Sequence, residues 1–167
     1  MATHVQKKLF TPARIGSITL KHRIVMPPMS RLRAQQPSGI PSDMMLDYYS
    51  QRASDGGLII TEATAVSPFG RGYTGAPGLF SDEQAIGWKR ITDSVHAKGG
   101  HMFAQLLHAG RTTHVAVTGS TPVTASVDPT YWANPNLSIL PPNTYMAPPV
   151  KSAHVDFSPF LCDFLRG

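Results

Sequence analysis

The sequence contains a single cysteine, Cys162, so it forms neither an internal disulfide nor a metal centre built from several cysteines. It also lacks any run near the ~20 apolar residues that a membrane-spanning helix requires. Residues 1–10 are polar and basic, without the apolar core of a signal peptide. We therefore expect a cytoplasmic protein, in a reducing compartment, with no membrane partner.

Charged residues are sparse as well. Asp, Glu, Lys and Arg make up 15% of the 167 residues, and the formal net charge is +5. The positive charges are scattered, as in Lys7-Lys8 and Lys89-Arg90, and form no stripe interleaved with aromatic residues. We therefore expect no nucleic-acid partner. The hydrophobic content of 41% is typical of a globular chain with a real core.

Three short apolar segments, residues 23–26, 58–63 and 102–107, have the composition of buried strands. The prolines at 27 and 28 end the first, because neither can donate to a strand ladder. The second follows two glycines and closes on the polar pair Thr61 and Glu62. Before all three, residues 9–20 predict a tight hairpin around a Gly-Ser turn.

Two segments with helical spacing separate the strands. Ser42 is placed to cap a helix that carries apolar residues Met45, Leu46, Tyr49 and Ala53. Ser81, with a glutamine three residues later, resembles a capping box ahead of the apolar stripe Ala85, Trp88, Ile91 and Val95. Because parallel strands need crossovers long enough to hold a helix, this alternation predicts an α/β fold with a parallel sheet.

Chemistry in such folds lies where the strands end. Gln105 interrupts the apolar run of the third strand, and a buried carboxamide must find partners for its donor and its acceptor atoms. Glu62 with His108 would suit a small hydrolytic domain, but no nucleophile elbow or metal-ligand spacing accompanies them. An acid at a strand end is more often a structural hydrogen-bond acceptor than a general base.

Several short motifs follow one another along the chain. They are LFTP at residues 9–12, LKHRIVMPPMSR at 20–31, YYSQRA at 48–53, IITEAT at 59–64, GRGY at 70–73 and QLLHAGR at 105–111. In this order, over residues 9 to about 115, they resemble the opening of the Old Yellow Enzyme family of FMN-dependent ene-reductases.

The resemblance implies a fold. The family has a (β/α)8 TIM barrel whose bottom is closed by an N-terminal hairpin and whose C-terminal mouth holds FMN. Residues 1–149 would then be the N-terminal part of such a barrel, with its first three parallel strands and two helices. Residues 150–167 do not fit the family pattern and would form a divergent tail.

The resemblance also implies cofactor contacts. Pro28, Met29 and Ser30 would touch the flavin ring, Ala63 would lie against it, and Gln105 would pair its amide with the pyrimidine edge. The residues taken alone leave simpler roles open: Ser30 could cap a turn, Ala63 could be a packing residue, and neighbouring backbone could satisfy the glutamine.

The reaction implied by the resemblance is reduction of FMN by NAD(P)H, followed by hydride transfer to an activated alkene such as an enone. In the family a His-x-x-Asn or His-x-x-His pair polarises the substrate carbonyl, and none of the seven histidines here is followed by Asn or His at that spacing. A whole barrel typically takes ~250 residues. We therefore expect a truncated chain without the catalytic half and with no catalytic residue assigned.

An open barrel edge would leave backbone groups and apolar surface exposed. We therefore expect self-association or pairing with a complementary fragment. The alternative is a non-catalytic remnant that acts, if at all, through protein association.

Overall fold

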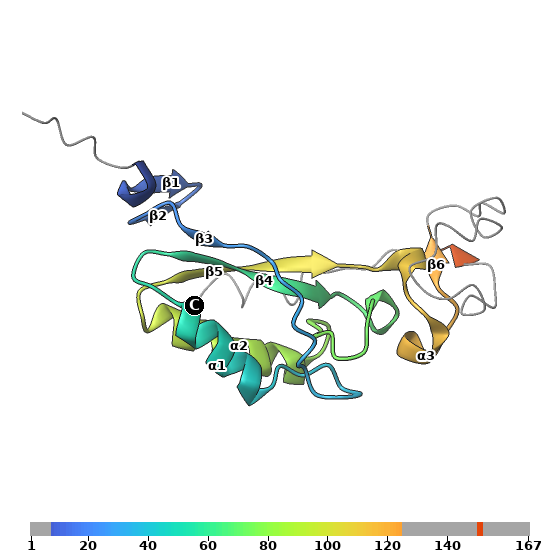
Figure 1. The fold of residues 1–167 in the computed structure, drawn as a ribbon. Helices are drawn as coiled ribbons and strands as arrows, with labels where there is room; N and C mark the ends of the chain where they lie inside the picture. The colour runs from blue at the N-terminus through green and yellow to red at the C-terminus, as the bar shows by residue number, and fades with distance from the viewer. Residues whose placement is uncertain (1–7, 125–149, 152–167) are drawn as a thin grey trace, which may run out of the picture.

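The structure is a computed structural model that describes residues 8–124 and 150–151. A three-stranded parallel sheet in the order β3-β4-β5 lies over two helices that pack against one of its faces (Figure 1). The strands are β3 (Val25–Met26), β4 (Leu58–Ala65) and β5 (His101–Leu107), and the helices are α1 (Asp43–Arg52) and α2 (Asp82–His96). The expected α/β fold with parallel strands is confirmed.

The expected hairpin precedes the sheet. Strand β1 (Ala13–Ile15) pairs antiparallel with β2 (Ile18–Leu20), after a 3-10 turn η1 (Lys8–Phe10). The backbone N–H of Lys21 donates to the carbonyl of Gly56 at 3.0 Å, which ties the hairpin to the residues just before β4. The hairpin therefore sits at the end of the sheet where the strands begin.

Short elements lie at the other end of the sheet. They are the 3-10 turns η2 (Pro68–Gly70) and η3 (Gly110–Thr112), the single-turn helix α3 (Val115–Thr118), and β6 (Val123–Thr124), which pairs in parallel with β7 (Val150–Lys151). In the described residues, no helix has the length and apolar character needed to cross a bilayer.

Both helices begin at the predicted caps. The hydroxyl of Ser42 accepts from the N–H of Met45, and the hydroxyl of Ser81 accepts from the N–H of Gln84, so each serine satisfies an unpaired amide of the first turn. The Gln84 side chain does not return to its cap residue. It accepts from the N–H of Phe80 at 2.8 Å and donates to the carbonyl of Ser38, so it fastens the loop before α1 to α2.

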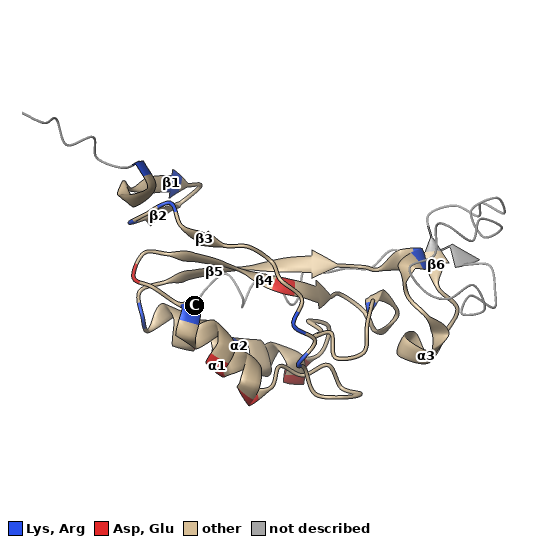
Figure 2. Cartoon of the chain, viewed as in Figure 1, with Lys and Arg blue, Asp and Glu red and all other residues tan. Residues whose placement is uncertain are grey.

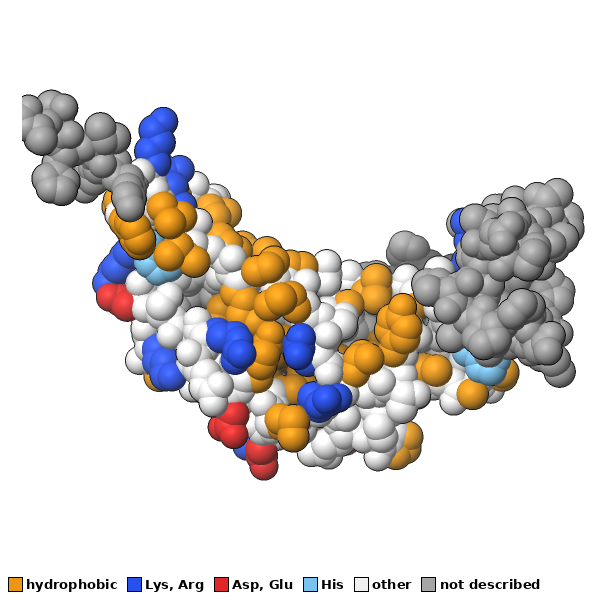
Figure 3. Space-filling model, viewed as in Figure 1, with side chains coloured by type: hydrophobic (Ala, Val, Ile, Leu, Met, Phe, Trp, Pro, Cys, Tyr) orange, Lys and Arg blue, Asp and Glu red, His pale blue; other side chains and the backbone are white. Residues whose placement is uncertain are grey.

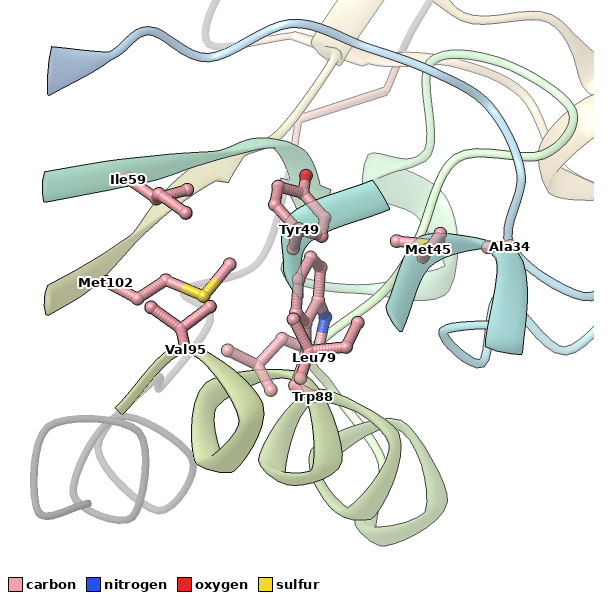
Figure 4. Packing of buried hydrophobic residues seen from close by; sticks show 9 residues of the cluster. Ala34, Met45, Tyr49, Ile59, Leu79, Trp88, Val95 and Met102 are labelled. Atoms are coloured by element: carbon pink, nitrogen blue, oxygen red, sulfur yellow. The ribbon is translucent and has the colours of Figure 1, made fainter. Parts of the chain in front are cut away.

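The core lies between the helices and the sheet (Figure 4). Trp88 and Tyr49 meet at its centre with ring centroids 5.8 Å apart, and both are essentially inaccessible to solvent. Ile59 and Met102 reach down to them from the sheet (Figure 4). Burial of such large side chains is the main stabilising contribution to folding.

Strand β4 is longer than the sequence predicts. The sequence predicts a strand over residues 58–63, yet β4 continues to Ala65. The loop folds back, so that the N–H of Ala65 donates to Pro77 at 2.9 Å and its carbonyl accepts from Leu79 at 2.8 Å. These two bonds extend the sheet with a partner that is distant in sequence. Residues 152–167 of the expected tail lie outside the described residues.

Candidate functional site

The candidate site lies on the face of the sheet that points away from α1 and α2. Along β5, Met102 and Leu106 pack toward the helices. Because side chains alternate along a strand, Phe103, Gln105 and Leu107 lie on the opposite face. No helix of the described part covers that face (Figure 1). We call it the open face.

Gln105 lies on the open face directly beside Ala63. The two residues are opposite each other in the parallel pairing of β4 and β5. Gln105 is exposed, and its carboxamide forms no hydrogen bond within the described residues, although its backbone N–H donates to the Thr61 hydroxyl at 3.0 Å. The expectation that this amide is buried was therefore wrong, because nothing described covers the open face, and within the described residues neighbouring backbone does not satisfy it.

The loop after β3 holds the other predicted contacts. Met29 is 40% exposed, Ser30 is exposed and Pro28 is half-buried. In the part of the chain that the structure describes, the Ser30 hydroxyl has no hydrogen-bond partner, so it does not cap a turn there. Ser30 directly precedes Arg31, whose N–H donates to the Glu62 carboxylate at 2.9 Å. The fold thus brings this loop to the same end of the sheet as Ala63.

Glu62 is the acidic residue at the centre of this arrangement. Figure 2 shows acidic colour within β4, and Glu62 is the only Asp or Glu of that strand. The residue is 1% exposed, and its carboxylate also accepts from the Tyr49 hydroxyl at 3.3 Å. Burial, and then the Glu62 charge, raise the pKa of Tyr49 well above its usual value of 10.0, despite the hydrogen bond from the Glu62 N–H. Tyr49 therefore stays protonated and donates to the carboxylate.

The proposed hydrolytic pair is not supported by the contacts of either residue. Glu62 is occupied by backbone amides, and the Nδ1 atom of His108 accepts from the N–H of Gly110 at 3.0 Å. Among the described residues, no group of three or more His, Cys, Asp or Glu could hold a metal ion.

A groove that the sequence did not predict lies at the opposite end of the strands. Its volume is ≈ 240 Å³, and it is lined by β3, the start of β4 and the residues after α1, namely Ile24, Val25, Met26, Arg52, Ala53, Ser54, Gly57, Leu58, Ile59 and Gly100. Ile24 and Val25 are 47% and 37% exposed beside it. Figure 3 shows hydrophobic side chains gathered in the middle of the visible face, next to several Lys and Arg side chains. Apolar surface of this kind marks places where another chain can pack.

Comparison with known proteins identifies relatives of the chain. It is 46% identical over 122 residues to flavin oxidoreductase hxnT of Emericella nidulans, covering 71% of this chain and 31% of that protein. The structure of the Old Yellow Enzyme homologue from Zymomonas mobilis matches with a TM-score of 0.69 and 47% identity, covering 73% of this chain and 34% of that one. Morphinone reductase in complex with tetrahydroNAD matches with a TM-score of 0.68 and 45% identity, covering 74% and 34%.

These matches agree with a broader one. The model of the NADH:flavin oxidoreductase / NADH oxidase family matches residues 8–146, which is most of the chain. The chain spans about a third of the length of the relatives named above. On the strength of the family match and the Old Yellow Enzyme homologues, the chain belongs to the NADH:flavin oxidoreductase / NADH oxidase family.

Proposed function

We propose that this chain forms the first portion of a (β/α)8 barrel and supplies one edge of the flavin site of an FMN-dependent ene-reductase. The observation that carries the proposal is the Gln105 carboxamide, which lies beside Ala63 on the open face and has no hydrogen-bond partner among the described residues. The family match over residues 8–146 supports a barrel portion over residues 1–149. Val150 and Lys151, which begin the proposed tail over 150–167, pair with β6 of that portion.

The side chains present fit a flavin ring. Gln105 offers a donor and an acceptor in one plane, as the pyrimidine edge of a flavin requires. Ala63 beside it has a small side chain that permits close approach of a flat ring. The Ser30 hydroxyl, which has no partner in the described part of the chain, can donate to a ring atom. Pro28 and Met29 would provide apolar contact. When bound, FMN would supply hydride transfer from NAD(P)H to an enone.

The chain's own part in that reaction is to bind and orient. The His-x-x-Asn or His-x-x-His pair that polarises the enone carbonyl in the family does not occur in this sequence. No residue here is therefore proposed as catalytic. The groups that activate the carbonyl would come from a polypeptide that completes the site.

Replacing Gln105 with leucine should weaken FMN binding by about 10- to 100-fold, because two hydrogen bonds to the ring edge are lost at about 1 kcal/mol or more each. The measurement is quenching of FMN fluorescence on titration with the purified chain. Anaerobic addition of NADPH or NADH, followed by an enone such as 2-cyclohexenone, then reports whether bound flavin is reduced and reoxidised.

The matched control is Ile86→Leu, a change of one apolar residue on the solvent face of α2, where Ile86 is 64% exposed. It should leave the FMN affinity unchanged. A wild-type chain that does not bind FMN, or a Q105L variant that binds as tightly as wild type, would contradict the proposal.

A second proposal concerns association, and the apolar surface favours it. We propose that the open face and the groove beside β3 are covered by a complementary fragment or by a second copy of the chain. Leu107 and Val25 are each 37% exposed, and β3 has a hydrogen-bonded neighbour on only one side among the described strands. An unpaired strand edge next to exposed apolar side chains favours strand addition.

Replacing Val25 with lysine should shift the chain toward the monomer, because a charge at the unpaired edge opposes strand addition. Sedimentation velocity over a 100-fold range of protein concentration measures the change. A wild-type chain that stays monomeric throughout would exclude self-association and leave the complementary fragment as the partner. Identical association of wild type and V25K would show that this edge is not the interface.

A further inference from the structure

The register of β4 changes at Thr61 and Glu62. Ile60 lies opposite Phe103, and Ala63 lies opposite Gln105. Between these two pairs β4 therefore contains one residue more than β5. Without the extra residue, strict alternation would place Glu62 on the open face with Ile60. With it, Ala63 takes that face, and Thr61 and Glu62 are both buried, at 0% and 1% exposure. Bulges of this kind redirect side chains, often beside active sites.

Hydroxyl groups replace the ladder bonds that the bulge interrupts. The carbonyl of Glu62 accepts from the hydroxyls of Thr61 at 2.9 Å and Thr64 at 2.8 Å. The Thr61 hydroxyl in turn accepts from the N–H of Gln105 at 3.0 Å. The Glu62 carbonyl and the Gln105 N–H at the bulge are therefore paired, and the Glu62 N–H donates to the Tyr49 hydroxyl at 2.8 Å, which together hold Glu62 in its turned position.

The turned carboxylate holds the loop after β3. Its Oε2 atom accepts from the N–H of Arg31 at 2.9 Å and from the N–H of Leu32 at 3.1 Å, while Oε1 accepts from the Tyr49 hydroxyl. The ion pairs Lys21–Asp55, Lys89–Asp93 and Arg90–Asp43 of the described part do not involve Glu62. Two backbone amides and one hydroxyl thus donate hydrogen bonds to this carboxylate. Hydrogen bonds to a charged acceptor are the stronger kind.

The loop itself needs such an anchor. Leu32 has a φ of 56°, a left-handed conformation that a branched side chain rarely adopts. The amides that Glu62 binds follow Ser30 directly, so they fix the end of the segment Pro28–Met29–Ser30. Glu62 also directly precedes Ala63 in the sequence. One residue thus links both halves of the proposed flavin contact.

We propose that Glu62 is a positioning residue that sets the loop after β3 against the Ala63–Gln105 edge. It does so through the amides of Arg31 and Leu32 and does not touch the flavin. The role in flavin binding rests on the function proposed above. The anchoring of the loop by Glu62 does not depend on that function, and it can be measured separately.

The first test needs no cofactor. Amide hydrogen exchange, followed by NMR on the wild-type chain, should show the N–H groups of Arg31 and Leu32 protected. The N–H of Arg33, which has no hydrogen-bond acceptor within the described residues, should exchange freely. In Glu62→Gln, exchange at Arg31 and Leu32 should accelerate by about 10- to 100-fold, because a neutral acceptor binds amides less strongly.

The second test uses FMN titration. Glu62→Gln should weaken FMN binding by about 10-fold, while Glu83→Gln, the same change at an exposed position of α2, should not. Unprotected Arg31 and Leu32 amides in the wild type would overturn the anchor, and this result does not depend on whether the variant folds. Faster exchange with unchanged FMN affinity would overturn the role in positioning. A wild-type chain that fails to bind FMN would instead refute the proposed function.

Discussion

Replacing Trp88 with alanine should lower the free energy of unfolding by about 4 kcal/mol. Trp88 is 1% exposed, packs on Tyr49 and donates from its indole nitrogen to the carbonyl of Gly78 at 3.0 Å. Truncation would leave a cavity and a buried carbonyl without its donor, and each of these costs stability. Urea unfolding followed by far-ultraviolet circular dichroism measures the change.

Two further variants make this test specific. Trp88→Phe keeps an aromatic ring but loses the hydrogen bond to Gly78. Its free energy of unfolding should therefore fall by less than that of the alanine variant. Ile86→Ala, on the exposed side of the same helix, should change stability by no more than about 0.5 kcal/mol. A W88A variant with the urea midpoint of the wild type would show that this core does not determine the fold's stability.

Replacing Gly75 with alanine should lower the free energy of unfolding by about 3 kcal/mol. Gly75 has a φ of +84°, and an added Cβ would lie 2.5 Å from the backbone oxygen of Leu32. Backbone atoms cannot swing aside as a flexible side chain can. The loop after β3 would have to move, and the bond from the Ala34 N–H to the Gly75 carbonyl would be strained. Urea unfolding again gives the magnitude.

Gly16 provides the matched control for this substitution. It has a φ of +57° in the hairpin, and an added Cβ would have no atom within 4 Å. Gly16→Ala should therefore lower the free energy of unfolding by only about 1 kcal/mol, the cost of a side chain on a left-handed backbone. If G16A and G75A lowered the free energy of unfolding equally, the close contact between position 75 and Leu32 would not explain the destabilisation. A loss of FMN affinity in G75A but not in G16A would further connect that loop to the cofactor.

Local chemistry predicted the elements well. Ser42 and Ser81 begin their helices because a capping serine acts on amides two or three residues away, and sequence order shows this directly. The helical spacing of Trp88, Ile91 and Val95 likewise predicted the buried face of α2. The alternation of strands and helices predicted the parallel sheet, since short crossovers leave few other arrangements.

Contacts between distant segments could not be predicted in this way. The bulge at Glu62 depends on which residues of β5 lie opposite β4, and the continuation of β4 to Ala65 depends on the return of a loop at Pro77. The exposure of Gln105 depends on what covers that face of the sheet. The alternation of side chains along β5 does not specify such a cover. The family resemblance gave Gln105, Ala63 and Ser30 their roles, and those roles await the FMN titration.

Because α1 and α2 pack on one side of the sheet while Ala63 and Gln105 point to the other, the residues that keep the chain folded and those that could recognise a ligand are separated by a single layer of backbone. Positions 103, 105 and 107 can therefore be varied in a combinatorial library while Trp88 and Tyr49 stay fixed. Such a library would explore new binding specificities on the open face, while the core around Trp88 and Tyr49 maintains the stability of the fold.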